Sequence, residues 1–98
     1  MGAHTFHTRA SGENAKSAFQ NAVEDAQYYH GQGGYTGTIA EKTSFTEIPA
    51  DEVGEADPDE YASQLIRDQD PRIESKWGPA GCIALGDNTY LFFGWASA

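Results

Sequence analysis

The chain has 98 residues and carries fifteen acidic side chains against six basic ones, for a net charge of −9. That balance argues against proteins that hold phosphate backbones with clustered Lys and Arg, so we expect no direct nucleic-acid binding. Only 39% of the residues are hydrophobic, but five Phe, five Tyr and two Trp supply large apolar areas. We therefore expect residues 1–98 to fold as a single domain.

The sequence also bears on the compartment. No apolar run approaches the roughly 20 residues needed to cross a bilayer, and the N-terminal segment lacks the apolar centre of a signal peptide. The lone Cys82 excludes an internal disulfide and fits a reducing environment. We expect a cytoplasmic protein with no membrane partner.

Residues 4–9 alternate as a first strand does. His4 and His7 are three residues apart, which on a strand points them to opposite faces, so they cannot chelate together. His30 and Cys82 would complete a four-ligand zinc set, but nothing in the spacing requires one. We predict no bound metal and no cofactor.

Residues 11–31 have the pattern of one long amphipathic helix. Ser11 is the expected N-cap, and Gly31 follows the last periodic residue as a C′ glycine. The apolar stripe recurs at steps of three and four. Its members are Ala15, Ala18, Phe19, Ala22, Val23, Ala26 and Tyr29.

A glycine-rich stretch, residues 31–34, leaves this helix. Phosphate-binding glycine loops precede a helix, where the dipole is positive, whereas this stretch follows one. The main interpretation of residues 31–34 is therefore a flexible helix cap and turn. His30, at the negative end of the helix dipole, is either a capping residue or a ligand contact.

Residues 35–42 combine Tyr, Thr and Ile in the manner of a second strand. Gly37 in its middle indicates close approach by another part of the protein, such as Trp77 or Trp95, or by a ligand. In the ligand interpretation, the threonine hydroxyls and Lys42 supply polar contacts.

Residues 44–48 continue as a bent or separate short strand, and an acidic connection follows Pro49. Asp57 is the expected N-cap of a short helix, with Pro58 at its first position and Glu60 at its third. That helix buries Tyr61, Ala62, Leu65 and Ile66. Asp70 and Pro71 predict one further helical turn.

The last segments, residues 82–85 and 89–96, predict a hairpin around Gly86-Asp87-Asn88. The final strand is apolar on both faces, so it is either central in its sheet or covered by a partner. A homo-oligomer formed through Tyr90–Trp95 is one consequence.

The order of these elements predicts an α+β fold. A small antiparallel-rich sheet packs on one long N-terminal helix, with one or two short helices in addition. The strand order is left open, a ferredoxin-like arrangement being one of several.

The stretches YYHGQGGYTGTIAEK, KWGPAGC and YLFFGWAS resemble those of small uncharacterised proteins encoded by bacteriophages and other mobile elements. The resemblance covers most of the chain and carries no catalytic residue with it. It implies a small accessory protein that acts inside a host cell, with opposition to a host defence system as one such role.

Catalysis has little support, because the chain has no nucleophile elbow, metalloprotease motif, CxxC or phosphate loop. Cys82 lies in an apolar strand and is expected in the core. His30 and Glu41 could act as general acid and base if the fold joined them.

Two binding hypotheses lead. In the first, a non-catalytic module captures a small, nucleotide-like ligand, with a site at His30, Tyr35, Thr36, Gly37, Thr38, Lys42, Lys76 and Trp77. In the second, an acidic inhibitor occupies the basic, nucleic-acid-handling surface of a host protein. Its contact residues would be Asp51, Glu52, Glu55 and Asp59.

Overall fold

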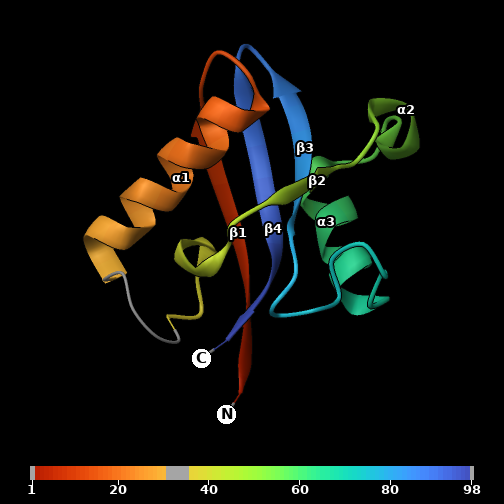
Figure 1. The fold of residues 1–98 in the computed structure, drawn as a ribbon. Helices are drawn as coiled ribbons and strands as arrows, with labels where there is room; N and C mark the ends of the chain where they lie inside the picture. Colours follow the sequence, from red (N-terminus) through yellow and green to blue (C-terminus); the bar gives the residue numbers. More distant parts are fainter. Residues whose placement is uncertain (1, 31–35, 98) are drawn as a thin grey trace.

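The computed structural model describes residues 2–30 and 36–97, which form a four-stranded sheet with helices on both faces (Figure 1). The predicted α+β class is confirmed, although α1, at 16 residues, is not unusually long. The elements in chain order are β1 (Ala3–Ser11), α1 (Ala15–His30), the 3₁₀ helix η1 (Ile39–Glu41), β2 (Phe45–Glu47), α2 (Ala50–Val53), α3 (Pro58–Arg67), β3 (Ala80–Gly86) and β4 (Thr89–Ser97).

The sheet has the order β1-β4-β3-β2, so the last strand of the chain lies between the first and the third. β4 pairs antiparallel with β1 from Ala3↔Ser97 to Ser11↔Thr89, and antiparallel with β3. β2 pairs parallel with β3. A parallel pair needs a long crossover connection, and α2 and α3 lie within it.

Two apolar clusters hold the helices to the sheet. On one face α1 packs through buried Ala18, Phe19 and Ala22 against side chains that include Phe92. On the other face α3 packs through Leu65 and Ile66 in a cluster built around β4 and β3. The strand residues of that second cluster are Ile83, Leu91 and Phe93.

β4 is therefore central in the sheet, and the alternation predicted for it is confirmed. Leu91, Phe92 and Phe93 are all 0% exposed, since successive side chains enter opposite clusters. Both edges of β4 are paired as well. The structure gives no support to the predicted homo-oligomer contact through Tyr90–Trp95, because the middle of the strand offers no uncovered face.

The β3–β4 hairpin follows the prediction closely. Asp87 and Asn88 connect the strands, and both have positive φ, at 54° and 61°. Positive φ at both central residues defines the turn that matches the twist of a hairpin, and Asp and Asn tolerate it better than most residues.

The N-terminus of α1 differs from the prediction. Ser11 is the last residue of β1, and Asn14 caps the helix by accepting a 2.8 Å hydrogen bond from the Ser17 backbone N–H. Tyr29, predicted on the apolar stripe, is 77% exposed. Strand pairing with β4 extends through residue 11 and so delays the start of the helix.

The predicted start of α3 is confirmed, because the Asp57 carboxylate accepts from the Glu60 N–H and Pro58 opens the helix. Tyr61, predicted as buried, is only partly so. The acidic connection before α3 contains the short helix α2, which the sequence did not reveal. The helical turn predicted after Asp70 is a hydrogen-bonded turn rather than a helix.

The second strand predicted over residues 35–42 is wrong. Residue 35 lies outside the described residues, Gly37 has a φ of +71°, and residues 39–41 form η1. Thr38 caps η1 by accepting from the Ala40 N–H. A positive φ at Gly37 turns the backbone away from an extended path, so local capping overrides the β propensity of Thr and Ile.

Gly81 provides a test of this packing. A Cβ at residue 81 would lie 2.4 Å from the Phe93 ring, which is fully buried. Gly81→Ala should therefore overpack the sheet and lower the free energy of unfolding by about 1–3 kcal/mol. Urea denaturation measures this loss.

Ala84→Ser is the matched control, because Ala84 is exposed on the same strand and should change stability by less than about 0.5 kcal/mol. Equal stability of Gly81→Ala and the wild type would contradict the close contact between β3 and the Phe93 ring.

Candidate functional site

The segment predicted as a ligand site, residues 36–42, is bound into the fold instead. Glu41 holds it to the end of β4. One carboxylate oxygen of Glu41 accepts from the Ser97 N–H at 2.9 Å. The other accepts from the Gly37 N–H at 2.7 Å and from the Thr36 hydroxyl at 3.1 Å. Glu41 is thus a structural anchor, and these bonds weaken its predicted role as an acid or base.

The two threonines of this segment are occupied by the same turn. The Thr36 and Thr38 hydroxyl oxygens lie 2.8 Å apart in a hydrogen bond, and Thr36 Oγ1 also accepts from the Thr38 N–H. These local bonds satisfy the hydroxyls that the sequence assigned to a ligand.

Gly37 is needed for packing and for backbone conformation. Its N–H also donates to the Ser97 carbonyl at 2.7 Å, and a Cβ at residue 37 would lie 3.0 Å from Nδ1 of His4. The predicted close approach to Gly37 is therefore real, but the neighbour is His4 rather than either tryptophan.

Lys42 is buried at 4% exposure, contrary to its predicted place on a binding surface. Its ammonium donates to the carbonyls of Gly78 at 2.9 Å, Lys76 at 3.2 Å and Ser75 at 3.5 Å. Burial lowers the pKa of Lys42, and neighbouring Glu41 partly offsets that effect. Lys42 fastens residues 75–78 to η1.

The remaining residues predicted for this site are Lys76, Trp77, His30 and Tyr35. Lys76 places its ammonium 5.4 Å from the centre of the Trp77 ring, which is 64% exposed. His30 ends α1, and Tyr35 lies outside the described residues. The structure brings together Thr36, Gly37, Thr38 and Lys42, but with their polar groups already bonded to protein.

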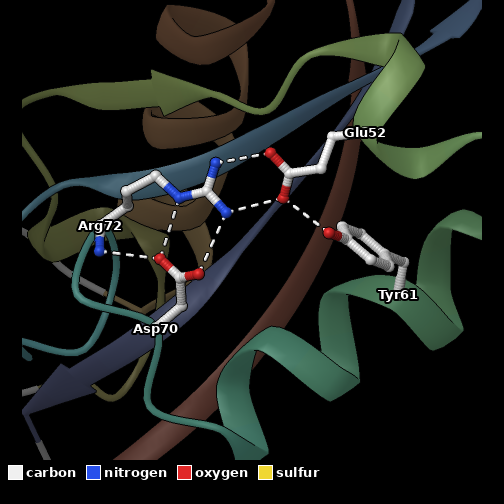
Figure 2. Close-up of polar contacts among 4 residues, drawn as sticks. All are labelled: Glu52, Tyr61, Asp70 and Arg72. Carbon is white, nitrogen blue, oxygen red and sulfur yellow. Dashed lines mark hydrogen bonds and ion pairs between the residues drawn. The ribbon is translucent and has the colours of Figure 1, made fainter.

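Glu52, one of the acidic residues predicted to contact a partner, belongs to a second internal network, which is drawn in Figure 2. Arg72 binds the Glu52 carboxylate through two bonds, of 2.9 and 2.7 Å, and also binds Asp70. The Tyr61 hydroxyl donates to Glu52 at 2.6 Å. The Arg72 guanidinium thus joins α2 to the turn at residues 70–72, and Tyr61 of α3 binds the same Glu52 carboxylate.

This network sets the pKa values of its members. Hydrogen bonds from Arg72 and Tyr61 lower the pKa of Glu52 to about 2, and hydrogen bonding to Arg72 lowers the pKa of Asp70. The bond to Glu52 raises the pKa of Tyr61. The Glu52 carboxylate, predicted to contact a partner, is therefore bonded within the fold.

Asp59, also predicted to contact a partner, binds Arg9 of β1 and lies 3.7 Å from Nδ1 of His7. Asp51 and Glu55 are exposed, and within the described ranges their carboxylates make no hydrogen bond or ion pair. Two of the four predicted acidic contacts thus stay available to a partner.

An open cleft of about 670 Å³ lies between β1 and α3, at a place the sequence did not indicate. Below it is called the α3 cleft. Its lining side chains include a guanidinium, two hydroxyls, an imidazole, an amide and an indole. Its lining is Thr5, His7, Ser63, Ile66, Arg67, Gln69 and Trp95.

Two polar groups of the α3 cleft are unpaired in the described part of the chain. The Arg67 side chain has no ion pair there, and the buried Nε1–H of Trp95 has no hydrogen-bond acceptor. Ser63 and Arg67 come from one helix, whereas Trp95 and His7 come from strands at the two ends of the chain. Because these segments are distant in sequence, no spacing motif could have found the cleft.

The groups considered for catalysis or metal binding are placed differently. Burial raises the pKa of the Cys82 thiol to about 12, and Cys82 is in the core as predicted. His4 approaches Gly37 on one face of β1, and His7 lines the α3 cleft on the other. Across residues 2–30 and 36–97, no three His, Cys, Asp or Glu side chains gather as a metal site would need.

No helix in the described part of the chain has the length and apolar character required to span a membrane. Comparison with known proteins places the chain in no group: it matches no protein-family model, no curated protein and no solved structure.

The Arg72 network predicts a pH effect on stability. The pKa of Glu52 in the folded state, about 2, lies below its ordinary value of 4.5. Its contribution is therefore complete above about pH 4.5 and is lost as the pH falls toward 2. Because the pair is partly exposed, Glu52→Gln should cost about 1 kcal/mol at pH 7 and less at pH 2.5.

Urea denaturation at both pH values measures the difference. Asp51→Asn removes a neighbouring charge outside the network and serves as the control, with an expected change within about 0.5 kcal/mol. If both variants lost the same stability at pH 7, Glu52 would have no special structural role.

Proposed function

We propose that this protein is a non-catalytic binding module that holds a small anionic ligand in the α3 cleft. The convergence of unpaired Arg67 with Ser63, Gln69 and the Trp95 indole in one hollow is the observation that carries this proposal. A guanidinium and a hydroxyl suit a phosphate or carboxylate, and an indole suits a flat ring. A nucleoside monophosphate has both parts.

The proposal keeps the ligand class expected from the sequence but moves the site. Residues 36–42 have their polar groups bonded to protein, whereas the exposed Arg67 of the α3 cleft has no ion pair with any described residue. A donor without a protein partner contributes more to the free energy of ligand binding than a donor already bonded within the protein, because no internal hydrogen bond is broken on binding.

The test is calorimetric titration with the four ribonucleoside monophosphates and with inorganic phosphate. The wild type should bind at least one nucleotide, and Arg67→Gln should weaken that binding at least tenfold, which is about 1.4 kcal/mol. Lys16→Gln removes an exposed cation from α1 and should leave the affinity unchanged.

Absence of binding at millimolar concentrations, together with no small molecule co-purifying in native mass spectrometry, would contradict the proposal. Equal effects of Arg67→Gln and Lys16→Gln would show that only net charge matters and that the α3 cleft is not the site.

A second candidate is an acidic inhibitor of a basic host protein, in the setting that the bacteriophage resemblance implies. The observation in its favour is the use of cations within the fold: Arg9 and Arg72 bind carboxylates and Lys42 is buried. The exposed acids Asp51 and Glu55 thus face solvent with little compensating charge nearby.

The double variant Asp51→Asn, Glu55→Gln should weaken association with such a partner and reduce its salt dependence. Binding would be measured against a basic nucleic-acid-binding protein of the host, at 50 and 300 mM salt. The double variant Glu13→Gln, Glu24→Gln makes the same charge change elsewhere. Equal weakening by both would exclude a specific surface at residues 51–55.

A further inference from the structure

The outward side of β1 presents unpaired backbone groups. β1 is an edge strand, and β4 is the only strand that pairs with it in the described sheet. The Gly12 N–H donates to the Asn88 carbonyl at 3.0 Å, so residues 12 and 88 form a hydrogen-bonded pair. Such pairs alternate along an antiparallel ladder, so even-numbered residues of β1 bond to β4 and odd-numbered ones face outward.

Ser11 supports this assignment, because its carbonyl accepts from the Asn21 side chain of α1 at 2.8 Å and not from β4. The other outward-facing backbone groups are those of Thr5, His7 and Arg9. We call these groups the outer edge of β1. No described residue forms a hydrogen bond with them. Natural sheets usually protect such an edge with a bulge, a proline or a covering element, and β1 has an uninterrupted register from residue 3 to 11.

The face of the sheet beside this edge is hollowed. An open groove of about 240 Å³ lies between β1 and α1, and below it is called the α1 groove. Its walls are mostly apolar, with Asp25 and Arg9 among the lining residues. The apolar and hydroxyl lining residues are Phe6, Thr8, Ala22, Ala26, Tyr29, Thr38 and Ile39.

A strand added along the outer edge would place every second side chain on the face that holds the α1 groove. Strand addition takes its affinity from backbone hydrogen bonds and its specificity from such hollows. The α1 groove and the outer edge of β1 together therefore have both parts of a strand-addition site.

We propose that the outer edge of β1 binds an extended segment of another protein, neutral or basic in charge, with an apolar side chain over the α1 groove. Charge selects this occupant over a second copy, which would bring a further net charge of −9. Asp25 in the groove and exposed Glu24 beside it favour Lys or Arg flanking the apolar residue. A second copy would also offer Phe6, which is already buried beneath its own α1.

Amide hydrogen exchange followed by NMR tests the edge geometry directly. In the free protein the amides of Thr5, His7 and Arg9 should exchange much faster than those of Phe6, Thr8 and Ala10. Slow exchange at all six would contradict an open edge.

Binding is tested with a displayed library of random twelve-residue peptides, selected on the wild-type protein. Selected peptides should carry an apolar residue flanked by Lys or Arg, and a synthetic copy should slow exchange at Thr5, His7 and Arg9. Arg9→Pro deletes one outward N–H and should weaken peptide binding at least tenfold. Arg9→Ala loses the same ion pair with Asp59 but keeps the N–H, so it should bind the peptide clearly more tightly than Arg9→Pro does.

The groove is tested separately. Ala26→Leu fills the α1 groove and should weaken the same peptide several-fold, whereas Gln20→Leu, at an exposed position of the same helix outside the groove, should not. None of these four variants alters a residue of the α3 cleft, so a failure here is distinct from failure of the nucleotide proposal.

Three results would overturn the inference. One is a library that yields no peptide sensitive to Arg9→Pro. Another is equal peptide binding by Arg9→Pro and Arg9→Ala. The third is a dimer in sedimentation velocity that Arg9→Pro dissociates, since a second copy of the chain would then occupy the edge.

Discussion

The burial of β4 on both faces and along both edges is the constraint on which the rest of the structure depends. Its even-numbered side chains receive α1 and its odd-numbered ones receive α3, so one nine-residue strand places both helical layers. Its end fixes the segment at residues 36–42 through Glu41 and Ser97. A strand without an exposed face leaves the two outermost strands and the helix surfaces to meet other molecules.

Three cationic side chains, Arg9, Arg72 and Lys42, each form hydrogen bonds or ion pairs between separate segments of the chain. Arg72 connects α2 to the turn at residues 70–72, Arg9 connects β1 to α3, and Lys42 connects η1 to residues 75–78. Hydrogen bonds to charged groups are stronger than neutral ones. Arg72 and Lys42 each bind several carboxylate or carbonyl oxygens, whereas Arg9 binds one carboxylate. An acidic chain with six bases thus uses three of them for contacts within the fold.

The sequence predicted what local pattern controls. The cap and proline at Asp57 and Pro58, the Asp87-Asn88 turn and the alternation along β4 all follow from neighbours in the chain. It failed at residues 35–42, where β-favouring side chains were overruled by a carboxylate and a glycine that serve the end of a distant strand. It also could not distinguish Glu52, bound by Arg72, from exposed Asp51 beside it, because that difference depends on a residue twenty positions away. The α3 cleft was out of reach for the same reason, since its walls come from both ends of the chain.

The pairing of Ala3 with Ser97 also governs how the fold is reached. Contacts between residues so far apart close a loop of nearly the whole chain, which slows folding relative to locally paired structures. During synthesis β1 and α1 emerge well before β4, the strand that receives them both. Until β4 emerges, Phe6 and Phe19 lack the contact with Phe92 that helps to bury them, so these apolar side chains stay exposed on the nascent chain. The sheet can therefore form only after β4 has been synthesised, because β4 lies between β1 and β3.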